Sequence, residues 1–409
     1  MKLRIGGPLW LSQAQRQAYP TLRGRHDADV VIVGGGITGA GVAQAFADAG
    51  IRVMLLEAGL VGHGSTAAST ALLLQETDED FSELENRYGR ARATRIWKLG
   101  RRSIRDFIAT LRQRRIVCDL AERDTVYYTL NPDHQKYLHA ESRRRRRTGF
   151  SAEWLDPVAL HAATGIAGQG AIRSRGNAQL DPYQACIGLL RSAASDGARI
   201  FEHSAVRHID VTRTGVVVRT RSGGIFAERV IVATGYATPA FAPIAGRFEM
   251  KHTYVLATRP VTAAERRRLG FGALLLWDTE RPYHYARWAP GHQLLLGGND
   301  RPLLPASRRK AAFESSVRRL HEYFSQVFPA LSEIEIEAAW EGLFAMTPDG
   351  LPYIGSHRRY PRHLFALGYG GNGMTFGFLA SRLLLDAYRN MKNPDLQLFA
   401  FNRFRSAGR

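Results

Sequence analysis

The sequence predicts an α/β protein in which a nucleotide-binding domain is interleaved with a second domain built on a mostly antiparallel sheet. Three observations lead to this fold class. A strand–turn–helix–strand unit occupies residues 29–59, elements that suit the same domain recur in two later stretches, and the stretches between them have a different strand and helix pattern. A chain that returns to one domain several times must cross repeatedly between two domains.

The unit at residues 29–59 begins with a buried strand and a glycine-rich turn. Val30–Val33 is a run of β-branched residues, and Gly34, Gly36 and Gly39 follow as G-x-G-x-x-G. Gly34 permits the tight turn, Gly36 lets a pyrophosphate approach the backbone, and Gly39 lets the helix lie close to the strand. The helix N-terminus then presents N–H groups and a positive dipole end to the pyrophosphate.

The second half of the unit completes the pattern. We expect the helix to run to about Ala49 and end at Gly50, with a second strand at Arg52–Leu56. Glu57 follows about 20 residues after the glycines, where an acid is needed to bind the ribose hydroxyls. A lone glycine motif occurs by chance, and Glu57 alone could be a surface carboxylate. All parts in the correct order indicate a Rossmann-like dinucleotide-binding unit.

The bulk composition is typical of a globular protein. The chain has 409 residues, 45% of them hydrophobic, which is enough for two domains. No apolar run approaches the roughly 18 residues of a membrane span, and the N-terminus lacks the features of a secretion signal. Cys118 and Cys186 are expected to be buried thiols rather than a disulfide. We therefore expect a cytoplasmic protein, and no metal site, because the 13 histidines show no ligand spacing.

The net charge is strongly basic, at +19 from 56 Lys and Arg against 37 Asp and Glu. A solvated basic surface is the simplest interpretation. Attraction of an acidic substrate, of nucleic acid or of an anionic membrane face are the functional alternatives. The densest cluster is the five consecutive arginines of Arg143–Arg147. Aromatic residues do not alternate with them, so a base-stacking platform is not indicated and no nucleic-acid partner is expected.

The recurrence of the nucleotide-binding pattern predicts a discontinuous domain. The nucleotide-binding domain is assigned to residues 28–80, 160–245 and 340–409. The second domain is assigned to residues 81–159 and 246–339, and residues 1–27 are expected to be an irregular lead-in.

Apolar spacing and turn residues predict the remaining elements. Helices are expected at residues 80–117, 133–147, 157–164, 181–194, 313–328 and 375–388. Strands are expected at residues 126–130, 199–203, 215–220, 229–233, 253–258, 294–298 and 364–367. The start of one helix is marked by Asp181 and Pro182, because Asp caps a helix and Pro suits its first position.

Two further glycine-containing segments are candidates for cofactor contact. Val230–Gly235 is an apolar strand that ends in small residues, which let a ligand pass close to the backbone. A second G-x-G-x-x-G lies at Gly368, Gly370 and Gly373. No strand ending in an acid follows it, so a second dinucleotide is not expected. A helix N-terminus at the edge of a flavin suits it better, because positive potential there stabilises the reduced ring.

Several segments in a fixed order resemble those of one enzyme family. They are VVIVGGGITGAGVAQAF with Glu57, then GHGSTAAST, DPYQACIGLL, VIVATGY, TPDGLPYIG and LGYGGNGMTFG. Over nearly its whole length the chain resembles the D-amino-acid oxidase, glycine oxidase and sarcosine oxidase (DAO) superfamily of flavoproteins. The lead-in PLWLSQ and the GSTAAST loop are most similar to a bacterial subgroup near the γ-glutamylputrescine oxidases.

The resemblance implies bound FAD and a set of positions that contact it. By motif position, Gly34, Gly36, Gly39 and Glu57 would hold the ADP half. The other implied positions are Gly64, Ser65 and Thr66 along the pyrophosphate and flavin, Val206, Thr234 and Gly235 around the adenosine, and Gly371, Asn372, Gly373, Met374 and Thr375 at the isoalloxazine. His63 could also touch the cofactor, or be an ordinary loop residue.

The chain departs from the family pattern at three positions. The arginine that binds the substrate carboxylate in glycine-oxidase-like members corresponds to Phe344, and a lysine of sarcosine-oxidase-like members corresponds to Thr375. The cysteine that tethers their flavin corresponds to Gly342, so non-covalent FAD is expected. These departures put a simple small amino acid in doubt as the substrate.

Candidate catalytic residues must therefore come from elsewhere. Arg287 could replace the missing arginine, because a guanidinium fork suits a carboxylate. On a strand, Tyr283, Tyr285 and Arg287 would share one face, which either looks onto the flavin or is structural. Tyr254 is a further pocket candidate.

The resemblance implies a reaction in which hydride leaves a C–H beside the nitrogen of an amine or amino acid for flavin N5. The imine then hydrolyses, and O₂ or another acceptor reoxidises the flavin. Three alternatives remain open: a 2-hydroxyacid dehydrogenase, which attacks a C–OH bond; an RNA-associated flavin enzyme, which the charge of +19 motivates; and an FAD protein without catalytic activity. The oligomeric state is left open by the sequence.

Overall fold

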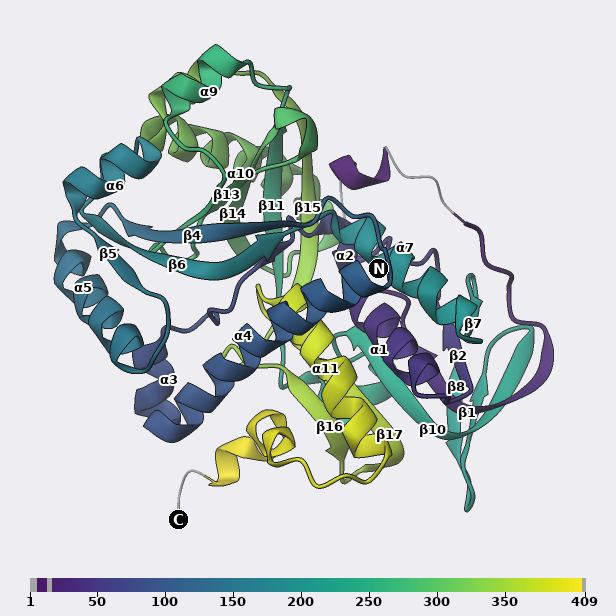
Figure 1. Ribbon diagram of the computed structural model, residues 1–409. Coiled ribbons are helices and arrows are strands. Elements are labelled where there is room, and N and C mark those ends of the chain that lie inside the picture. The colour runs from purple at the N-terminus through teal and green to yellow at the C-terminus, as the bar shows by residue number, and fades with distance from the viewer. Residues whose placement is uncertain (1–5, 13–16, 407–409) are drawn as a thin grey trace.

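The structure is a computed structural model that describes residues 6–12 and 17–406. Two sheets lie side by side, with helices packed around them (Figure 1). The predicted α/β class is confirmed, and the chain passes between the two sheets several times.

The first sheet has the strand order β16-β17-β10-β1-β2-β7, with β8 and β9 attached beside β10. Its central strands run parallel, and the side chains of Val30, Val31 and Ile32 are fully buried. A strand covered on both faces needs the continuous apolar run that the sequence provides. Its strands are β1 (Gly24–Val33), β2 (Val53–Leu56), β7 (Arg199–Phe201), β8 (His208–Val211), β9 (Val216–Arg219), β10 (Gly223–Gly235), β16 (Tyr353–His357) and β17 (Tyr360–Leu367).

Three helices lie beside the first sheet, and α1 packs against each of the other two. They are α1 (Ile37–Asp48), α7 (Pro182–Ser195) and α11 (Gly373–Tyr388). The side chains of Ala43 and Phe46 are buried in α1. The Asp181 carboxylate caps α7 by accepting hydrogen bonds from the N–H groups of Tyr183 and Gln184.

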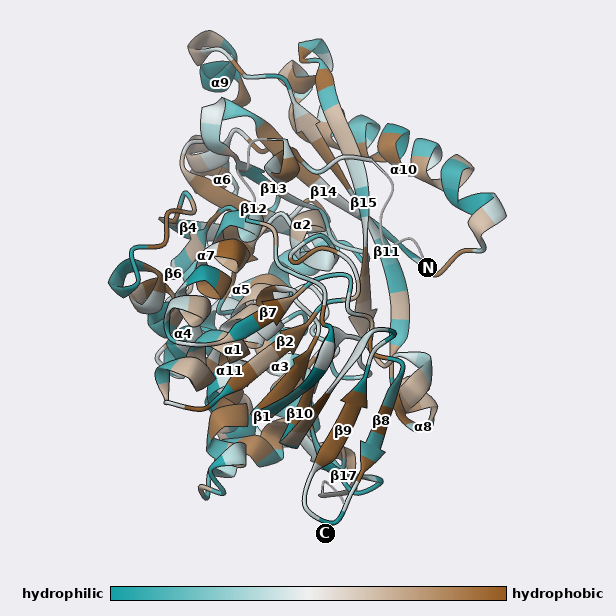
Figure 2. Cartoon of the chain, turned by 90° about the vertical axis from the view of Figure 1, so that its right-hand side faces the viewer, coloured by the Kyte–Doolittle hydropathy of each residue, from teal (hydrophilic) through white to brown (hydrophobic). Residues whose placement is uncertain are grey.

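The second sheet is mostly antiparallel, as expected, with one parallel pair between β4 and β12. The long helix α10 (Ala306–Val327) packs on β11 and β14, and Figure 2 shows it along the outside of the molecule beside β15. The strands of the second sheet are β3 (Leu72–Leu73), β4 (Ala121–Thr129), β5 (Glu153–Leu155), β6 (Gly170–Gln179), β11 (Glu249–Thr258), β12 (Leu274–Asp278), β13 (Tyr285–Trp288), β14 (Leu294–Pro302) and β15 (Ile336–Met346).

The remaining helices connect these layers. They are α2 (Ser65–Ala68), α3 (Phe81–Tyr88), α4 (Arg90–Gln113), α5 (Pro132–Arg147), α6 (Pro157–Thr164), α8 (Ala242–Ala245) and α9 (Ala263–Leu269). The helix predicted over residues 80–117 is two helices, because Gly89 adopts a positive φ of 78° between them.

Strand pairing shows where the chain changes sheet. Within the stretch 160–245, assigned to the nucleotide-binding domain, β6 pairs with β4 and therefore lies in the second sheet. Likewise β3 pairs with β6. The exact domain boundaries stay a prediction. β3 and β6 belong to the second sheet, although the other strands of residues 28–80 and 160–245 belong to the first.

The lead-in is more regular than predicted. Residues 1–5 and 13–16 lie outside the described part, but Gly24 already pairs with Gly223 at the start of β1. A backbone bridge also joins Gly6 to Trp340. The expectation of irregular structure is thus wrong for residues 24–27. They lack the apolar side chains that would predict a strand, but their backbone continues the pairing of β1 with β10.

The run of arginines is only partly a solvated surface. Arg143, Arg144, Arg146 and Arg147 are exposed, but Arg145 is buried. Its guanidinium lies 2.8 Å from Asp80 and 2.7 Å from Glu141, and 4.6 Å from the ring centre of Trp97. Both cysteines are free and buried, as expected. Within the described residues, no helix is long and apolar enough to cross a membrane.

Candidate active site

A cavity of about 930 Å³ lies between the two sheets. The first sheet contributes the ends of β1 and β10, and the second contributes parts of β11, β12, β14 and β15. The carboxyl ends of parallel strands are where ligands bind in open α/β sheets. The cavity therefore places the glycine turn and the second sheet on opposite sides of one space.

The glycine turn after β1 forms a cradle that larger residues would fill. Gly34 has a φ of +112°, and a Cβ there would lie 2.5 Å from the carbonyl oxygen of Ala233. A Cβ on Gly39 would lie 1.9 Å from the carbonyl oxygen of Gly34, so the close packing of α1 on β1 requires glycine. Gly34 and Gly36 line the cavity, whereas Gly39 lies behind them. This bare backbone beside a helix N-terminus fits a pyrophosphate.

Glu57 lies on the cavity wall at the end of β2. Its two carboxylate oxygens accept hydrogen bonds from the N–H groups of Gly35 and Gly59, each at 2.8 Å. These bonds fix the carboxylate beside the glycine turn. This position on the cavity wall is compatible with the predicted contact between Glu57 and a ribose.

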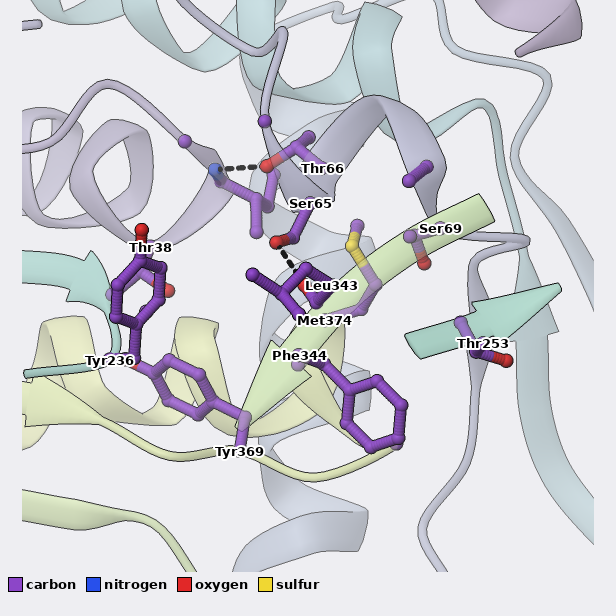
Figure 3. A pocket seen from close by; sticks show the side chains of 18 of the residues that line it. Thr38, Ser65, Thr66, Ser69, Tyr236, Thr253, Leu343, Phe344, Tyr369 and Met374 are labelled. Carbon is purple, nitrogen blue, oxygen red and sulfur yellow. Dashed lines mark hydrogen bonds between the residues drawn. The ribbon is translucent and has the colours of Figure 1, made fainter. Parts of the chain in front are cut away.

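The segment Gly64–Thr66 forms the next part of the wall. Thr66 Oγ1 accepts a hydrogen bond from the N–H of Ile37 at 2.9 Å, and Ser65 Oγ donates one to the carbonyl oxygen of Leu343 at 2.6 Å (Figure 3). Helix α2 thus connects the start of α1 to β15 of the second sheet. His63 also lines the cavity.

The residues expected around an adenosine are brought together at the end of β10. Val206, Thr234 and Gly235 all line the cavity. Thr234 Oγ1 donates a hydrogen bond to the carbonyl oxygen of Tyr236 at 2.8 Å, which turns the chain away from the strand.

The loop before α11 lines the cavity with Gly371 and Asn372, and the start of α11 adds Gly373 and Met374. Thr375 is not among the residues that line it, and its hydroxyl donates a hydrogen bond to the carbonyl oxygen of Leu74 at 2.9 Å. This placement differs from the expected contact of Thr375 with the isoalloxazine.

Asp78 holds this loop in place. Its carboxylate accepts hydrogen bonds from the N–H of Gly371 at 2.8 Å and from the Asn372 side chain at 2.9 Å. Sequence reasoning missed Asp78, which follows no glycine motif. Three consecutive acids at residues 78–80 are the only signal that could have drawn attention to it.

The candidate catalytic residues divide into two groups. Tyr283 and Tyr285 line the cavity, with ring centres 6.0 Å apart. Tyr254 and Arg287 do not line it. Tyr254 follows Thr253, which faces the cavity, and successive strand residues point to opposite sides. Its ring lies against Phe313 of α10, with ring centres 6.3 Å apart.

Arg287 shares a strand face with Tyr285 but lies two residues farther along β13, beyond the cavity. There it donates a hydrogen bond to the carbonyl oxygen of Leu180 at 2.9 Å and lies 5.1 Å from the ring centre of Trp10. The expectation that Arg287 replaces the carboxylate-binding arginine is therefore wrong for this cavity, because its guanidinium is buried against Leu180 and Trp10 instead.

Two carboxyl groups give the second-sheet side of the cavity an acidic character. Burial raises the pKa of Asp78 to about 6, and burial also raises the pKa of Asp300 to about 6. A hydrogen bond from the Gly371 N–H partly offsets the pKa shift of Asp78, and one from Thr253 partly offsets that of Asp300. Among the described residues that line the cavity there is no Lys or Arg.

The described residues contain no group of three or more His, Cys, Asp and Glu that could hold a metal ion. The cavity can instead hold an extended ligand, with backbone N–H groups at one end and aromatic and acidic side chains at the other.

Comparison with known proteins identifies this architecture. Residues 29–387 match the family model for FAD dependent oxidoreductases, DAO. The γ-glutamylputrescine oxidoreductase of Escherichia coli is 28% identical over 91% of this chain and 86% of its own length. A glycine oxidase of Geobacillus kaustophilus is 27% identical over 92% of this chain and 97% of its own length.

Solved structures share the fold. The crystal structure of glycine oxidase from Geobacillus kaustophilus has a TM-score of 0.78 at 24% identity, covering 92% of this chain and 99% of that one. L-amino acid deaminase from Proteus myxofaciens also has a TM-score of 0.78, at 16% identity, covering 98% of both chains. The family match covers most of both sheets and nearly all of the cavity lining, so this chain belongs to the DAO family of FAD-dependent oxidoreductases.

Proposed function

We propose that this enzyme oxidises the C–N bond of an amine or amino acid. The observation that carries the proposal is the single cavity that runs from the glycine turn of the first sheet to Tyr285 and Asp300 of the second. Relatives named glycine oxidase and γ-glutamylputrescine oxidoreductase support this reaction class. Bound FAD supplies the hydride acceptor and passes the electrons to O₂ or another acceptor.

In this proposal the protein positions the cofactor with backbone groups. Gly34 and Gly36 let the pyrophosphate lie against the start of α1, and Glu57 holds the ribose. The wall formed by Val206, Thr234 and Gly235 encloses the adenosine. The segment Gly371–Met374, which includes the start of α11, faces the flavin, and the N-terminus of this helix stabilises negative charge on the reduced ring.

We propose that FAD is held without a covalent bond. A Cβ at Gly342 would lie 2.9 Å from the Cβ of Ala68, which leaves no room for a tethering side chain there. Cys118 and Cys186 are buried and do not line the cavity. Burial also raises the pKa of the Cys118 thiol to about 12, which keeps it protonated and unreactive at neutral pH.

The substrate is placed on the second-sheet side of the cavity. Phe344, Tyr283 and Tyr285 give it an apolar and water-excluding wall. The substrate loses a hydride from carbon and a proton from nitrogen, and the resulting imine reacts with water to give a carbonyl compound and an amine or ammonia. We also propose a cytoplasmic location, which suits the two free thiols.

Anaerobic mixing of the purified protein with amines, amino acids and 2-hydroxyacids tests this function. Bleaching of the oxidised-flavin absorption by amines or amino acids is the expected result. Bleaching by 2-hydroxyacids alone would move the reaction to C–OH oxidation and overturn the proposal.

A further inference from the structure

We infer that the substrate is an amine with a second, positively charged nitrogen, and that Asp300 on β14 binds this distant charge. The inference deepens the proposed function and rests on it. A diamine is the simplest member of this substrate class. Three features of the second-sheet side of the cavity carry the argument.

The first feature is the buried and unpaired oxygen of Asp300. Asp300 lines the cavity, and its Oδ1 is buried without a hydrogen-bond partner among the described residues. Asp78 differs, because both of its oxygens accept hydrogen bonds from the loop before α11. A buried carboxylate oxygen without a partner costs free energy unless a ligand satisfies it. Asp300 is therefore the acidic group available to a ligand.

The second feature is a group of aromatic rings on the same wall. Tyr283 lies between Trp277 and Tyr285, with ring centres 6.2 Å and 6.0 Å apart, and all three residues line the cavity. The charge of Asp300 contributes to the raised pKa of both Tyr283 and Tyr285, so the carboxylate lies close to these two rings. Aromatic faces beside a carboxylate favour alkylammonium groups.

The third feature is the lack of a partner for a substrate carboxylate. The described lining residues include no Lys or Arg, and Phe344 stands in the wall near Thr253. Lys251 and His284 lie close enough to act on Asp300, but neither lines the cavity. Lys251 pairs with Glu249 at 3.6 Å, and His284 pairs with Asp278 at 2.8 Å. A carboxylate on the substrate would therefore meet Asp300 and Asp78 with like charge.

The chemistry of the reaction places the positive charge on a second nitrogen. The nitrogen next to the reacting C–H must be neutral when hydride leaves, because its lone pair forms the new C=N bond. A charge that remains bound during this step belongs to another nitrogen. The substrate thus has one neutral reacting amine and one distant cation.

A matched series of amines tests the inference on the holoenzyme. 1,5-Diaminopentane, pentylamine and 5-aminopentanoate differ only in the group at the far end, which is cationic, neutral or anionic. The ratio of the flavin reduction rate to the apparent Kd is measured anaerobically for each. We expect this ratio to be about ten-fold or more higher for the diamine than for pentylamine, and lowest for 5-aminopentanoate.

Variants at Asp300 assign the preference to its charge. Asp300→Asn should reduce the preference for the diamine over pentylamine to within about three-fold, and Asp300→Glu should restore part of it. Asp210→Asn, on the exposed strand β8, is the matched control and should behave as the wild type. Binding of tetramethylammonium, followed by the flavin difference spectrum, gives a readout that requires no turnover and should weaken in Asp300→Asn.

The outcomes separate this inference from the proposed function. Equal reduction by all three amines, or the diamine preference persisting in Asp300→Asn, overturns the cation site but leaves C–N oxidation intact. Failure of every amine and amino acid to reduce the flavin overturns the proposed function, and tetramethylammonium binding that depends on Asp300 then still supports the cation site. If Asp300→Asn does not fold, the wild-type series decides.

Discussion

The carboxylate of Asp78 accepts a hydrogen bond from the backbone N–H of Gly371, 2.8 Å away and 293 positions later in the chain. The bond connects the segment after β3 to the loop that begins α11. Tyr283 packs closely against the same glycine, because a Cβ on Gly371 would lie 2.0 Å from the hydroxyl oxygen of Tyr283. The loop proposed to face the flavin follows β17 of the first sheet and is held by residues beside β3 and β13 of the second.

Replacing Asp78 should loosen this loop and weaken FAD binding. Asp78→Ala removes the acceptor of two hydrogen bonds to the loop, which corresponds to roughly 1–3 kcal/mol, or about 5- to 150-fold in Kd. Titration of the apoprotein with FAD, followed by flavin fluorescence, measures the change. Asp210→Ala is the control. An unchanged Kd for Asp78→Ala would show that the loop is not held by this carboxylate.

The glycine turn permits a comparison of two glycines on the same helix. Gly39→Ala places a Cβ 1.9 Å from the carbonyl oxygen of Gly34 and should reduce FAD retention and lower the free energy of unfolding. Gly41→Ala places its Cβ 3.7 Å from the Cβ of Ser381, an ordinary contact, and alanine favours a helix over glycine by about 1 kcal/mol. Denaturant unfolding of both variants measures the difference. Equal effects would contradict the close packing of α1 on β1.

The buried ion pairs of Arg145 should contribute strongly to stability. Arg145→Met leaves the carboxylates of Asp80 and Glu141 buried without their cation, which costs about 3–5 kcal/mol. Arg146→Met changes the exposed neighbour and should stay within about 0.5 kcal/mol of the wild type. Urea denaturation with a constant m-value compares the two. Similar stabilities would show that the network contributes little.

Cation binding should weaken in acid. Burial raises the pKa of both Asp300 and Asp78 to about 6, so each carboxyl takes up a proton as the pH falls through about 6 and loses the charge that attracts a cation. The tetramethylammonium Kd should therefore be constant above pH ~7 and rise by up to about ten-fold per pH unit below pH ~6.

The groups that face these carboxyls determine the shape of this profile. Lys251 lowers the pKa of both, His284 lowers that of Asp300, and Arg281 lowers that of Asp78. Asp300→Asn separates the two titrations, because Asp78 still titrates in that variant. A profile that is the same with and without Asp300 would exclude this residue as the titrating cation site.

The sequence was most informative where backbone geometry alone creates the function. The spacing of Gly34, Gly36 and Gly39 specifies a turn, a bare backbone and a close helix, and each follows from a missing side chain. Glu57 was also predictable, because it lies at a fixed sequence distance from the glycines within the same strand–turn–helix–strand unit. The fold class followed from such local patterns.

Residues that meet only through long-range pairing could not be placed in this way. The spacing of Tyr285 and Arg287 correctly predicted a shared strand face, but not that the cavity ends between them. Whether Thr253 or Tyr254 faces the cavity depends on the register between β11 and its neighbours. Asp78 and Asp300 carry no local motif, and only folding brings them together.

The most direct test of C–N oxidation is a single anaerobic turnover with product analysis. The purified protein is mixed with an excess of amine substrate, and the reduced FAD, the carbonyl product and the released ammonia are measured in the same sample. The account predicts FAD bound as purified, and carbonyl product and ammonia in amounts equal to the FAD reduced. Protein that stays colourless after incubation with FAD, or flavin reduction without release of ammonia from a primary amine, would contradict it.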